Sequence, residues 1–407
     1  MENRGKHKKQ VIQGVLLMVT LITTTLAGAE WMYGKSLFFG DETLTFTQVV
    51  TGLYFSIPFL GILTVHEFGH YFTARIYKIS VTLPYYIPVW LGFIGIPTIG
   101  TMGAFIRIKG GIRSRKHFFD IGLAGPLAGF VVALGVILYG FTHLPPPEYI
   151  FEIHPEYQQY GLDYAEHVYK NQEFSYVLGD NLVFLFFEHF VADPALVPNQ
   201  YEMYHYPWLF AGYLALFFTA LNLLPIGQLD GGHVLYGLLG TKTSRLVSRV
   251  LFLIMVTVSG IGLVPLGELD FSFAVSLLLY GGFLMLTFHH FEKNLRKRFL
   301  LVIWIIIIQM FANKFFPLEG DYGFYLFFSF LIGRFLGVDH PQAIDNRSLS
   351  PGRKILGWIT LAVFVISFTP RPLYIKENKN ARKLKEPGHE VSIQRSAIIA
   401  RRVIEIF

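Results

Sequence analysis

The sequence predicts an all-α polytopic membrane protein with about nine transmembrane helices and a re-entrant β-like hairpin. Composition is the first reason, because 53% of the 407 residues are hydrophobic and 15% are charged, against about 25% charged residues in soluble domains. The second reason is a series of apolar windows, each near the roughly 20 residues that cross a bilayer. The third is that basic residues cluster beside these windows, as topology signals do. The windows are 11–29, 50–77, 119–142, 207–224, 247–266, 271–288, 299–313, 322–337 and 355–370.

The first window also resembles a secretory signal peptide, because a basic segment precedes it and the small residues Ala27, Gly28 and Ala29 end it. We favour a retained transmembrane helix. The apolar run is long for a signal peptide, and it ends at Trp31 and Tyr33, which suit a membrane interface.

Charge sets the predicted orientation of the chain. The basic N-terminus lies inside, so the basic segment 107–116 also lies inside and the acidic segment 143–206 lies outside. About nine crossings then place the basic tail 371–407 outside, against the positive-inside rule. Either one late window is re-entrant or the tail is an exception.

The apolar segment 80–106 is broken by Pro84, Pro88, Pro97 and several glycines, which disfavour a straight helix. We predict a hairpin that re-enters the protein just after the 50–77 window. Non-helical backbone is tolerated at membrane depth only where it is buried in protein or lines a cavity.

Composition also excludes several kinds of site. Cysteine is absent, so disulfides and thiolate ligands are excluded and a metal must be held by His, Asp or Glu. The net charge of +6 does not indicate nucleic-acid binding, because the basic residues flank apolar windows instead of covering one soluble domain.

The 50–77 window contains His66, Glu67 and His70, and ionisable groups at membrane depth are functional candidates by default. Positions four apart share one helix face, so both histidines can hold one metal ion while Glu67 points toward its bound water. A catalytic zinc site needs three protein ligands and an open position, so one more ligand must come from elsewhere. The alternative is a pair of hydrogen-bonded core histidines, with Glu67 paired to a Lys or Arg.

Asp230 is the candidate for that ligand, because it follows a membrane-length window among helix-breaking glycine and proline residues. If Asp230 joins His66 and His70, the histidines gain a metal and the carboxylate gains a counter-charge. Taken separately, Asp230 can cap a helix that begins at Gly231.

Three further polar residues have structural alternatives. Asn222 can bind an extended substrate backbone or a developing oxyanion, or it can make an interhelical hydrogen bond. His233 is interpreted as a supporting residue, because three ligands already suffice. Small residues in 120–135 predict close helix packing, with Asp120 as an N-cap.

Three stretches together resemble the site-2 protease family of intramembrane zinc metalloproteases: His-Glu-Phe-Gly-His at 66–70, Ala-Gly-Pro-Leu-Ala-Gly at 124–129 and Asn-Leu-Leu-Pro-Ile-Gly-Gln-Leu-Asp-Gly-Gly at 222–232. The resemblance implies a three-helix catalytic core and single-span membrane proteins as substrates. It further implies one zinc ion held by His66, His70 and Asp230, with Glu67 as the catalytic carboxylate and Asn222 assisting at the scissile peptide.

The chain departs from the family pattern at Gly129 and Gly227, where many members have asparagine and proline; neither position holds metal. Segment 143–206 is short for the PDZ domain that some members carry there, and it lacks a clear strand pattern. We therefore predict a PDZ-free, many-spanning member.

The predicted function is regulated intramembrane proteolysis by a zinc-dependent endopeptidase in a bacterial cytoplasmic membrane. A zinc transporter and an inactive scaffold of the same fold are the alternatives. The expected partners are the lipid bilayer and single-span substrates, with no nucleic acid. The predicted segments are an N-terminal helix and link (1–49), the two parts of the catalytic core (50–142 and 207–245), an acidic insert (143–206), additional helices (246–370) and a basic tail (371–407).

Overall fold

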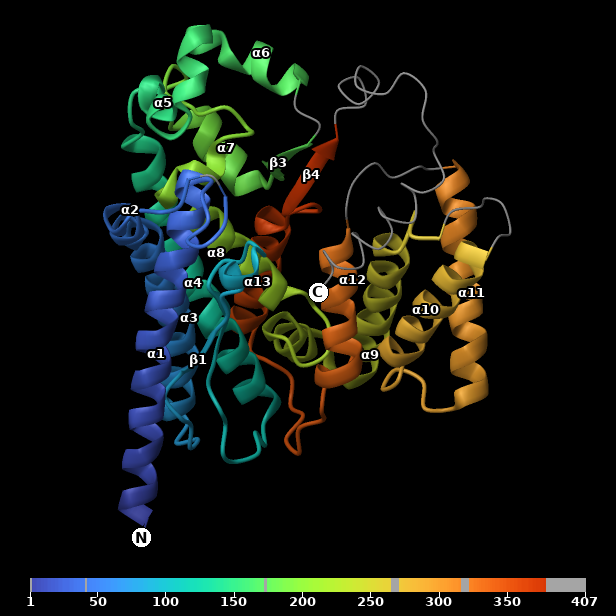
Figure 1. Cartoon of the computed structure of the whole chain (residues 1–407). Coiled ribbons are helices and arrows are strands. Elements are labelled where there is room, and N and C mark those ends of the chain that lie inside the picture. Colours follow the sequence, from blue (N-terminus) through green and yellow to red (C-terminus); the bar gives the residue numbers. More distant parts are fainter. Residues whose placement is uncertain (1, 41, 172–173, 265–270, 316–321, 378–407) are drawn as a thin grey trace.

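The computed structural model describes residues 2–40, 42–171, 174–264, 271–315 and 322–377. This part of the chain is mostly helical, as predicted, with α1 along one side of the molecule and α11 on the opposite side (Figure 1). The helices are α1 (Glu2–Tyr33), α2 (Phe46–Thr51), α3 (Leu53–Ile76), α4 (Arg115–Thr142), α5 (Ile150–Ile153), α6 (Tyr164–Asn171), α7 (Leu182–Phe190), α8 (Pro207–Leu223), α9 (Asp230–Ser259), α10 (Phe271–Thr287), α11 (Leu295–Phe315), α12 (Gly323–Leu331) and α13 (Pro351–Ser367).

Helices coincide with the predicted windows, but a count of nine spans is not confirmed. The 247–266, 299–313 and 355–370 windows lie largely on α9, α11 and α13. In the described part of the chain, three helical stretches are long and apolar enough to cross a membrane, namely His7–Tyr33, Phe46–Ile76 and Arg115–Thr142, and shorter apolar helices occupy Pro207–Leu223, Phe273–Thr287 and Gly323–Leu336.

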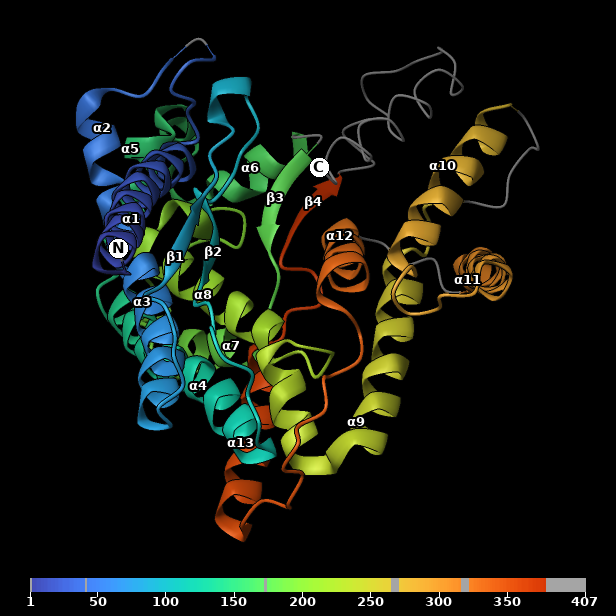
Figure 2. The same ribbon diagram turned by 90° about the horizontal axis from the view of Figure 1, so that it is seen from below.

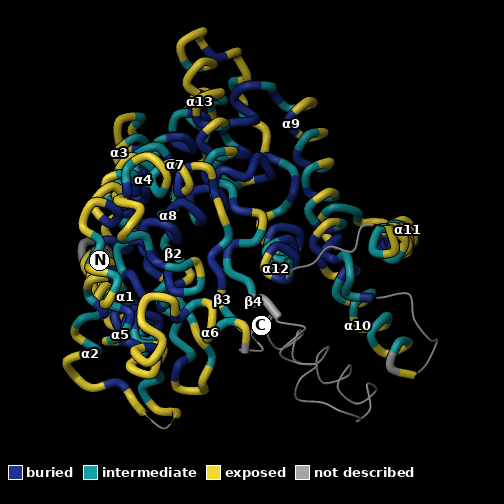
Figure 3. Tube along the Cα trace, turned by 90° about the horizontal axis from the view of Figure 1, so that it is seen from above, coloured by how far each residue is buried: buried dark blue, intermediate teal, exposed yellow. Residues whose placement is uncertain are grey.

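The centre of the fold is formed by α3, α4, α8 and the first half of α9, which pack on one another. Helix α8 is buried along most of its length (Figure 3), as expected for a helix that is apolar on every face. Gly69 of α3 lies against the backbone of Ala124 in α4, so closely that an added Cβ would sit 2.6 Å from the Ala124 carbonyl oxygen. The predicted close packing of small residues is therefore confirmed.

The prediction that Asp120 is an N-cap is wrong. Helix α4 begins earlier, at Arg115, with Ser114 before it. Asp120 is instead held from outside its helix, by an ion pair of 2.9 Å with Arg353 of α13 and by a hydrogen bond from the Tyr77 hydroxyl. These two partners satisfy the carboxylate, so it does not need the backbone N–H groups that a capping side chain binds.

Strands β1 (Tyr85–Pro88) and β2 (Thr101–Phe105) form the hairpin predicted for 80–106. They are antiparallel, with an irregularity between Tyr86 and Pro88, and they lie alongside α1 and α3 (Figure 2). The hydroxyls of Tyr86 and Thr64 are 2.7 Å apart, which ties β1 to α3. Re-entry of this hairpin into a membrane stays a prediction.

The insert 143–206 and the tail share a second antiparallel pair. Strand β3 (Phe174–Leu178) of the insert pairs with β4 (Leu373–Glu377) of the tail, with Val177 opposite Tyr374. The other described elements of the insert are helices. Figure 1 shows β3 and β4 side by side at the end of the molecule that carries α5, α6 and α7.

Candidate metal centre

Helix α3 presents His66 and His70 on one face, one turn apart. Both side chains are buried, with 5% and 7% of their surface exposed, and their Nε2 atoms are 3.1 Å apart. Asp230, the first residue of α9, brings its Oδ2 atom to 3.5 Å from His66 Nε2 and 3.2 Å from His70 Nε2. We call these three residues the core cluster.

The spacing of the core cluster fits one zinc ion. Two donors bound about 2.0 Å from a tetrahedral zinc ion lie about 3.3 Å apart, and the three measured separations are 3.1, 3.2 and 3.5 Å. Two imidazoles and one carboxylate are also a donor set that zinc prefers. The residues therefore fit the metal that the resemblance implies.

Glycines allow Asp230 to reach the histidines. Gly227 has a φ of +58°, in the left-handed region that favours glycine. A Cβ at Gly231 would lie 1.9 Å from the Leu223 carbonyl oxygen, and one at Gly232 would lie 2.3 Å from the Gly227 carbonyl oxygen. The chain thus turns back tightly after α8, and α9 begins at Asp230 with no room for larger side chains. The residue before α9, in the N-cap position, is Leu229, so Asp230 is not the N-cap of a helix that begins at Gly231.

Helix α4 forms a cradle for His70. The His70 Nδ1–H donates to the Ile121 carbonyl oxygen at 2.7 Å, which leaves Nε2 with a lone pair toward the cluster. A Cβ at Gly125 would lie 2.1 Å from His70 Nε2. The small residues of 124–129 therefore make space for the imidazole as well as for helix packing.

Glu67 lies beside the cluster and is 5% exposed. Its Oε1 is 3.9 Å from His66 Nε2, and its carboxylate accepts a hydrogen bond from the backbone N–H of Ile106, just after β2. Within the described residues it forms no ion pair with a Lys or Arg. The alternative of core histidines with a cation-paired glutamate therefore lacks its cation.

Asn222 lines a small cavity together with His66 of α3 and Gly103 of β2. The cavity volume is about 20 Å³, enough for about one water molecule. Residues of α3, α8 and the hairpin therefore meet at this cavity. The substrate-binding role of Asn222 and its alternative, an interhelical hydrogen bond, both stay predictions.

His233 does not belong to the group of ligand atoms from His66, His70 and Asp230 that lie within 4.8 Å of one another, as expected for a supporting residue. Its Nδ1 is 2.7 Å from Nε2 of His340, and the other His340 nitrogen, Nδ1, donates to the Pro341 carbonyl oxygen. His340 and the Ile106 backbone donor are two contacts that no sequence pattern predicted. His340 and Ile106 lie outside the helices and strands, at no regular spacing from His233 or Glu67, and only the fold brings them together.

Two histidines and an aspartate at the spacing of zinc ligands, with a buried glutamate beside them, are typical of metallohydrolases. The apolar helices around them indicate a membrane protein. The family model for peptidase family M50 matches residues 54–266, which is 213 of the 407 residues. The chain belongs to peptidase family M50, and the resemblance to site-2 proteases is confirmed.

Similar proteins carry related names. The chain is 29% identical over 199 residues to the probable zinc metalloprotease EGY2, chloroplastic, of Oryza sativa subsp. indica, covering 49% of this chain and 31% of that protein. It is 28% identical over 200 residues to the probable zinc metalloprotease EGY1, chloroplastic, of Arabidopsis thaliana, covering 49% and 32%. The chain thus spans about a third of the length of these curated relatives. No solved structure matches it. The apolar helices indicate a membrane protein, and the relatives, which are named chloroplastic, give no support to a bacterial cytoplasmic membrane.

Proposed function

We propose that this chain is a zinc-dependent intramembrane endopeptidase that hydrolyses peptide bonds in or near the membrane spans of single-span proteins. The convergence of His66, His70 and Asp230 beside Glu67 carries the proposal. The core cluster holds one zinc ion, and the family and the names of the relatives support that metal. The catalytic part of the chain comprises 50–142 and 207–245.

Zinc supplies Lewis acidity and lowers the pKa of a coordinated water toward 7. The other steps belong to side chains of this protein. Glu67 accepts the proton of the attacking water and then delivers it to the leaving amine. The Ile106 N–H fixes its carboxylate at the cluster, so a general base is in position before substrate arrives.

Asn222 stabilises the substrate from the opposite helix. Asn222 lines the same cavity as His66, and an amide N–H near the reacting carbonyl stabilises the oxyanion that develops there. The small cavity and the burial of the cluster limit the water that reaches the site, which strengthens these electrostatic contacts.

The hairpin holds the unwound substrate segment. A helix hides its peptide bonds, so substrate must be extended locally, and a free strand edge binds extended chains by backbone hydrogen bonds. The β1–β2 sheet has two strands, and β2 contributes Gly103 to the cavity at the cluster. Met102→Pro removes a backbone donor in β2, whereas Met102→Ala keeps it. Met102→Pro should lower cleavage of several substrates; unchanged cleavage of all of them would refute this role.

The central test uses purified protein in lipid, with Glu67→Gln and Asp230→Ala and a panel of tagged single-span substrates. Glu67→Gln should lose cleavage by about 100-fold or more while retaining the core zinc ion. Asp230→Ala should weaken zinc binding at the core cluster and lose cleavage as well. Zinc binding without cleavage of any substrate would favour a transporter, which a zinc-flux assay in vesicles detects, and wild type without zinc at the core cluster would refute the proposal.

A further inference from the structure

A second group of metal-type donors lies in the insert, outside the predicted membrane spans. His154 follows α5, whereas Glu202 and His205 lie just before α8. His205 Nε2 is 3.1 Å from Glu202 Oε2. His154 Nε2 is 3.4 Å from His205 Nε2 and 3.9 Å from Glu202 Oε2. We call these residues the insert cluster.

The outer nitrogens of both histidines are already engaged. The His205 Nδ1–H donates to the Met32 carbonyl oxygen in α1 at 2.7 Å. The His154 Nδ1–H donates to the Glu156 carboxylate at 3.0 Å. Carbonyl and carboxylate oxygens only accept, so these nitrogens carry the hydrogen and both Nε2 atoms present lone pairs to the same point. Histidine ligands of metals are held by this kind of outer hydrogen bond.

Glu202 is buried with an unsatisfied oxygen. Glu202 and His205 are 2% and 1% exposed. Glu202 Oε1 accepts a hydrogen bond from the Tyr169 hydroxyl, but within the described residues no hydrogen bond reaches Glu202 Oε2. A buried carboxylate oxygen facing two lone pairs is costly unless a cation lies between them. That cation is a metal ion or a proton shared with His205.

We propose that His154, Glu202 and His205 bind a second zinc ion, which fixes the insert to α1 and to the start of α8. Two histidines and one glutamate form a donor set that zinc takes. Their separations of 3.1, 3.4 and 3.9 Å bracket the roughly 3.3 Å expected around a tetrahedral zinc ion. The His154 side chain is 24% exposed, so the ion enters from solvent and keeps an open position on that side.

The ion would close a long loop. The 47 residues 155–201 separate His154 from Glu202, and an ion that joins the two ends reduces the conformational freedom of this segment in the unfolded chain. His205 stands two residues before Pro207, the first residue of α8. The insert cluster therefore sets where α8 begins, at the opposite end from Asn222.

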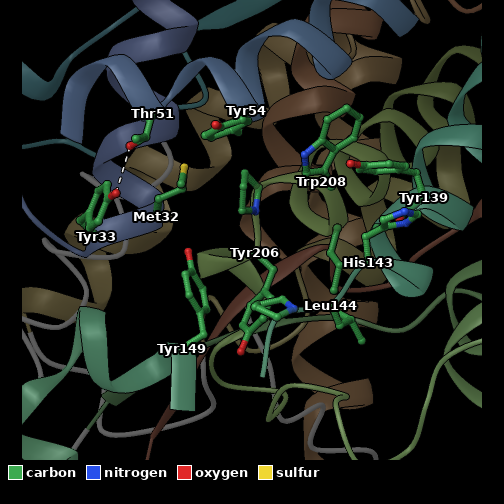
Figure 4. Close-up of a pocket in the computed structure, with 14 residues that line it drawn as sticks. Met32, Tyr33, Thr51, Tyr54, Tyr139, His143, Leu144, Tyr149, Tyr206 and Trp208 are labelled. Atoms are coloured by element: carbon green, nitrogen blue, oxygen red, sulfur yellow. Dashed lines mark hydrogen bonds between the residues drawn. The ribbon is translucent and has the colours of Figure 1, made fainter. Parts of the chain in front are cut away.

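The insert cluster also borders a cavity that is larger than the one beside Asn222. This cavity of about 430 Å³ is lined by residues from α1, the end of α4 and the start of α8 (Figure 4). Met32 and Tyr149, which line it, contact His205 through the Met32 carbonyl and through a hydrogen bond of 3.3 Å from the Tyr149 hydroxyl to the His205 carbonyl oxygen. Burial raises the pKa of the Tyr149 hydroxyl, so it remains a donor. Loss of the ion would loosen one wall of this cavity.

Zinc content of the full-length protein tests the proposal. After equilibration with buffered Zn²⁺ in detergent, wild type should hold about two zinc ions per chain, and His154→Ala and Glu202→Gln should each hold one fewer. Asp230→Ala should also lose one, from the core cluster, and Asp230→Ala with His154→Ala should hold none. Zinc should raise the Tm of Asp230→Ala but not that of the double variant, because only the former retains a site.

His189→Ala, which removes an exposed histidine elsewhere in the insert, is the matched control and should keep both ions. Unchanged zinc content in folded His154→Ala and Glu202→Gln would overturn the proposal and leave a proton as the cation. Because Asp230→Ala and His154→Ala are measured separately, failure of the core cluster is distinguishable from failure of the insert cluster. Glu202→Gln keeps the shape of the side chain, so its zinc content still tests the proposal if His154→Ala fails to fold.

Discussion

The core cluster and the insert cluster contain the same kinds of donor, but the chain builds them differently. In the core cluster, two ligands lie four residues apart on one long helix, and the glycines of α4 leave space for them. In the insert cluster, the ligands lie on short turns at both ends of a long loop, and Glu156, which orients His154, is 62% exposed. The first cluster is positioned by packed backbone, and the second depends on a few polar contacts.

This difference has a kinetic consequence. His66 and His70 are buried at 5% and 7% exposure, whereas the His154 side chain is 24% exposed. Ligands on buried helices separate only when the packing opens, while surface turns open at lower free energy. A chelator should therefore remove one ion before the other, with the insert cluster emptied first.

The largest expected effect comes from filling the cradle of the core cluster. In Gly125→Ala, the new Cβ would lie 2.1 Å from His70 Nε2, so the imidazole must leave its position. We expect zinc affinity at the core cluster to fall by about 100-fold or more, together with cleavage, and the insert cluster to keep its ion. Zinc content and substrate cleavage are the measurements. Gly135→Ala, on the same helix with nothing within 4 Å of the added Cβ, should change neither; unchanged zinc in Gly125→Ala would show that packing does not position the site.

The next effect tests the insert cluster through its polar support. Glu156→Ala removes the acceptor for His154 Nδ1–H and touches none of the three ligands. Loss of such outer partners usually lowers metal affinity by about 10- to 100-fold. Competition with a zinc chelator should show this decrease at the insert cluster alone, and Glu148→Ala, an exposed residue nearby, is the control. Equal affinities in both variants would mean that Glu156 does not orient the histidine.

The sequence predicted the core cluster because its ligands follow helical geometry. His66 and His70 share a face in any helix, and Asp230 stood out as an acid among glycines after an apolar window. The ligands of the insert cluster do not have the spacing of one helix face that His66 and His70 have. His154 and Glu202 are separated by 47 residues without a regular spacing of donors, so no sequence pattern pairs them.

The same limit applies to the fold. Apolar windows predicted where helices lie, and the prolines of 80–106 predicted the hairpin, because these signals are local. The pairing of β3 with β4 is not local, and it joins the insert to a tail about 200 residues later. The pair also bears on the orientation of the chain. If each of the six predicted windows between the two strands crosses the membrane, the even number returns the chain to the side of the insert, which agrees with the pairing. The exception of the tail to the positive-inside rule stays a prediction.

A smaller effect is expected from linking these two strands. Val177 and Tyr374 lie directly opposite each other in β3 and β4, and the chain has no cysteine of its own. Val177→Cys with Tyr374→Cys should form a disulfide on oxidation, since opposed residues in antiparallel strands have the separation that a disulfide needs. The oxidised protein should gain a few degrees in Tm and keep both zinc ions. A membrane-impermeant thiol reagent should label Tyr176→Cys, at an exposed position of β3, and Tyr374→Cys from the same side; labelling from opposite sides would contradict the pairing.

The smallest effect should come from the Asp120–Arg353 ion pair beside the core cluster. Asp120 precedes Ile121, whose carbonyl receives the His70 Nδ1–H, so an electrostatic account of the site would give this pair a large role. The Arg353 side chain is 33% exposed, and such pairs contribute about 1 kcal/mol or less. If backbone packing positions the core cluster, Arg353→Gln should lower the Tm only slightly and leave zinc affinity and cleavage within about threefold of wild type. Lys354→Gln, at the neighbouring position, is the control for charge. A decrease in zinc affinity as large as that of Gly125→Ala would mean that both clusters, and not the insert cluster alone, depend on polar contacts at their periphery.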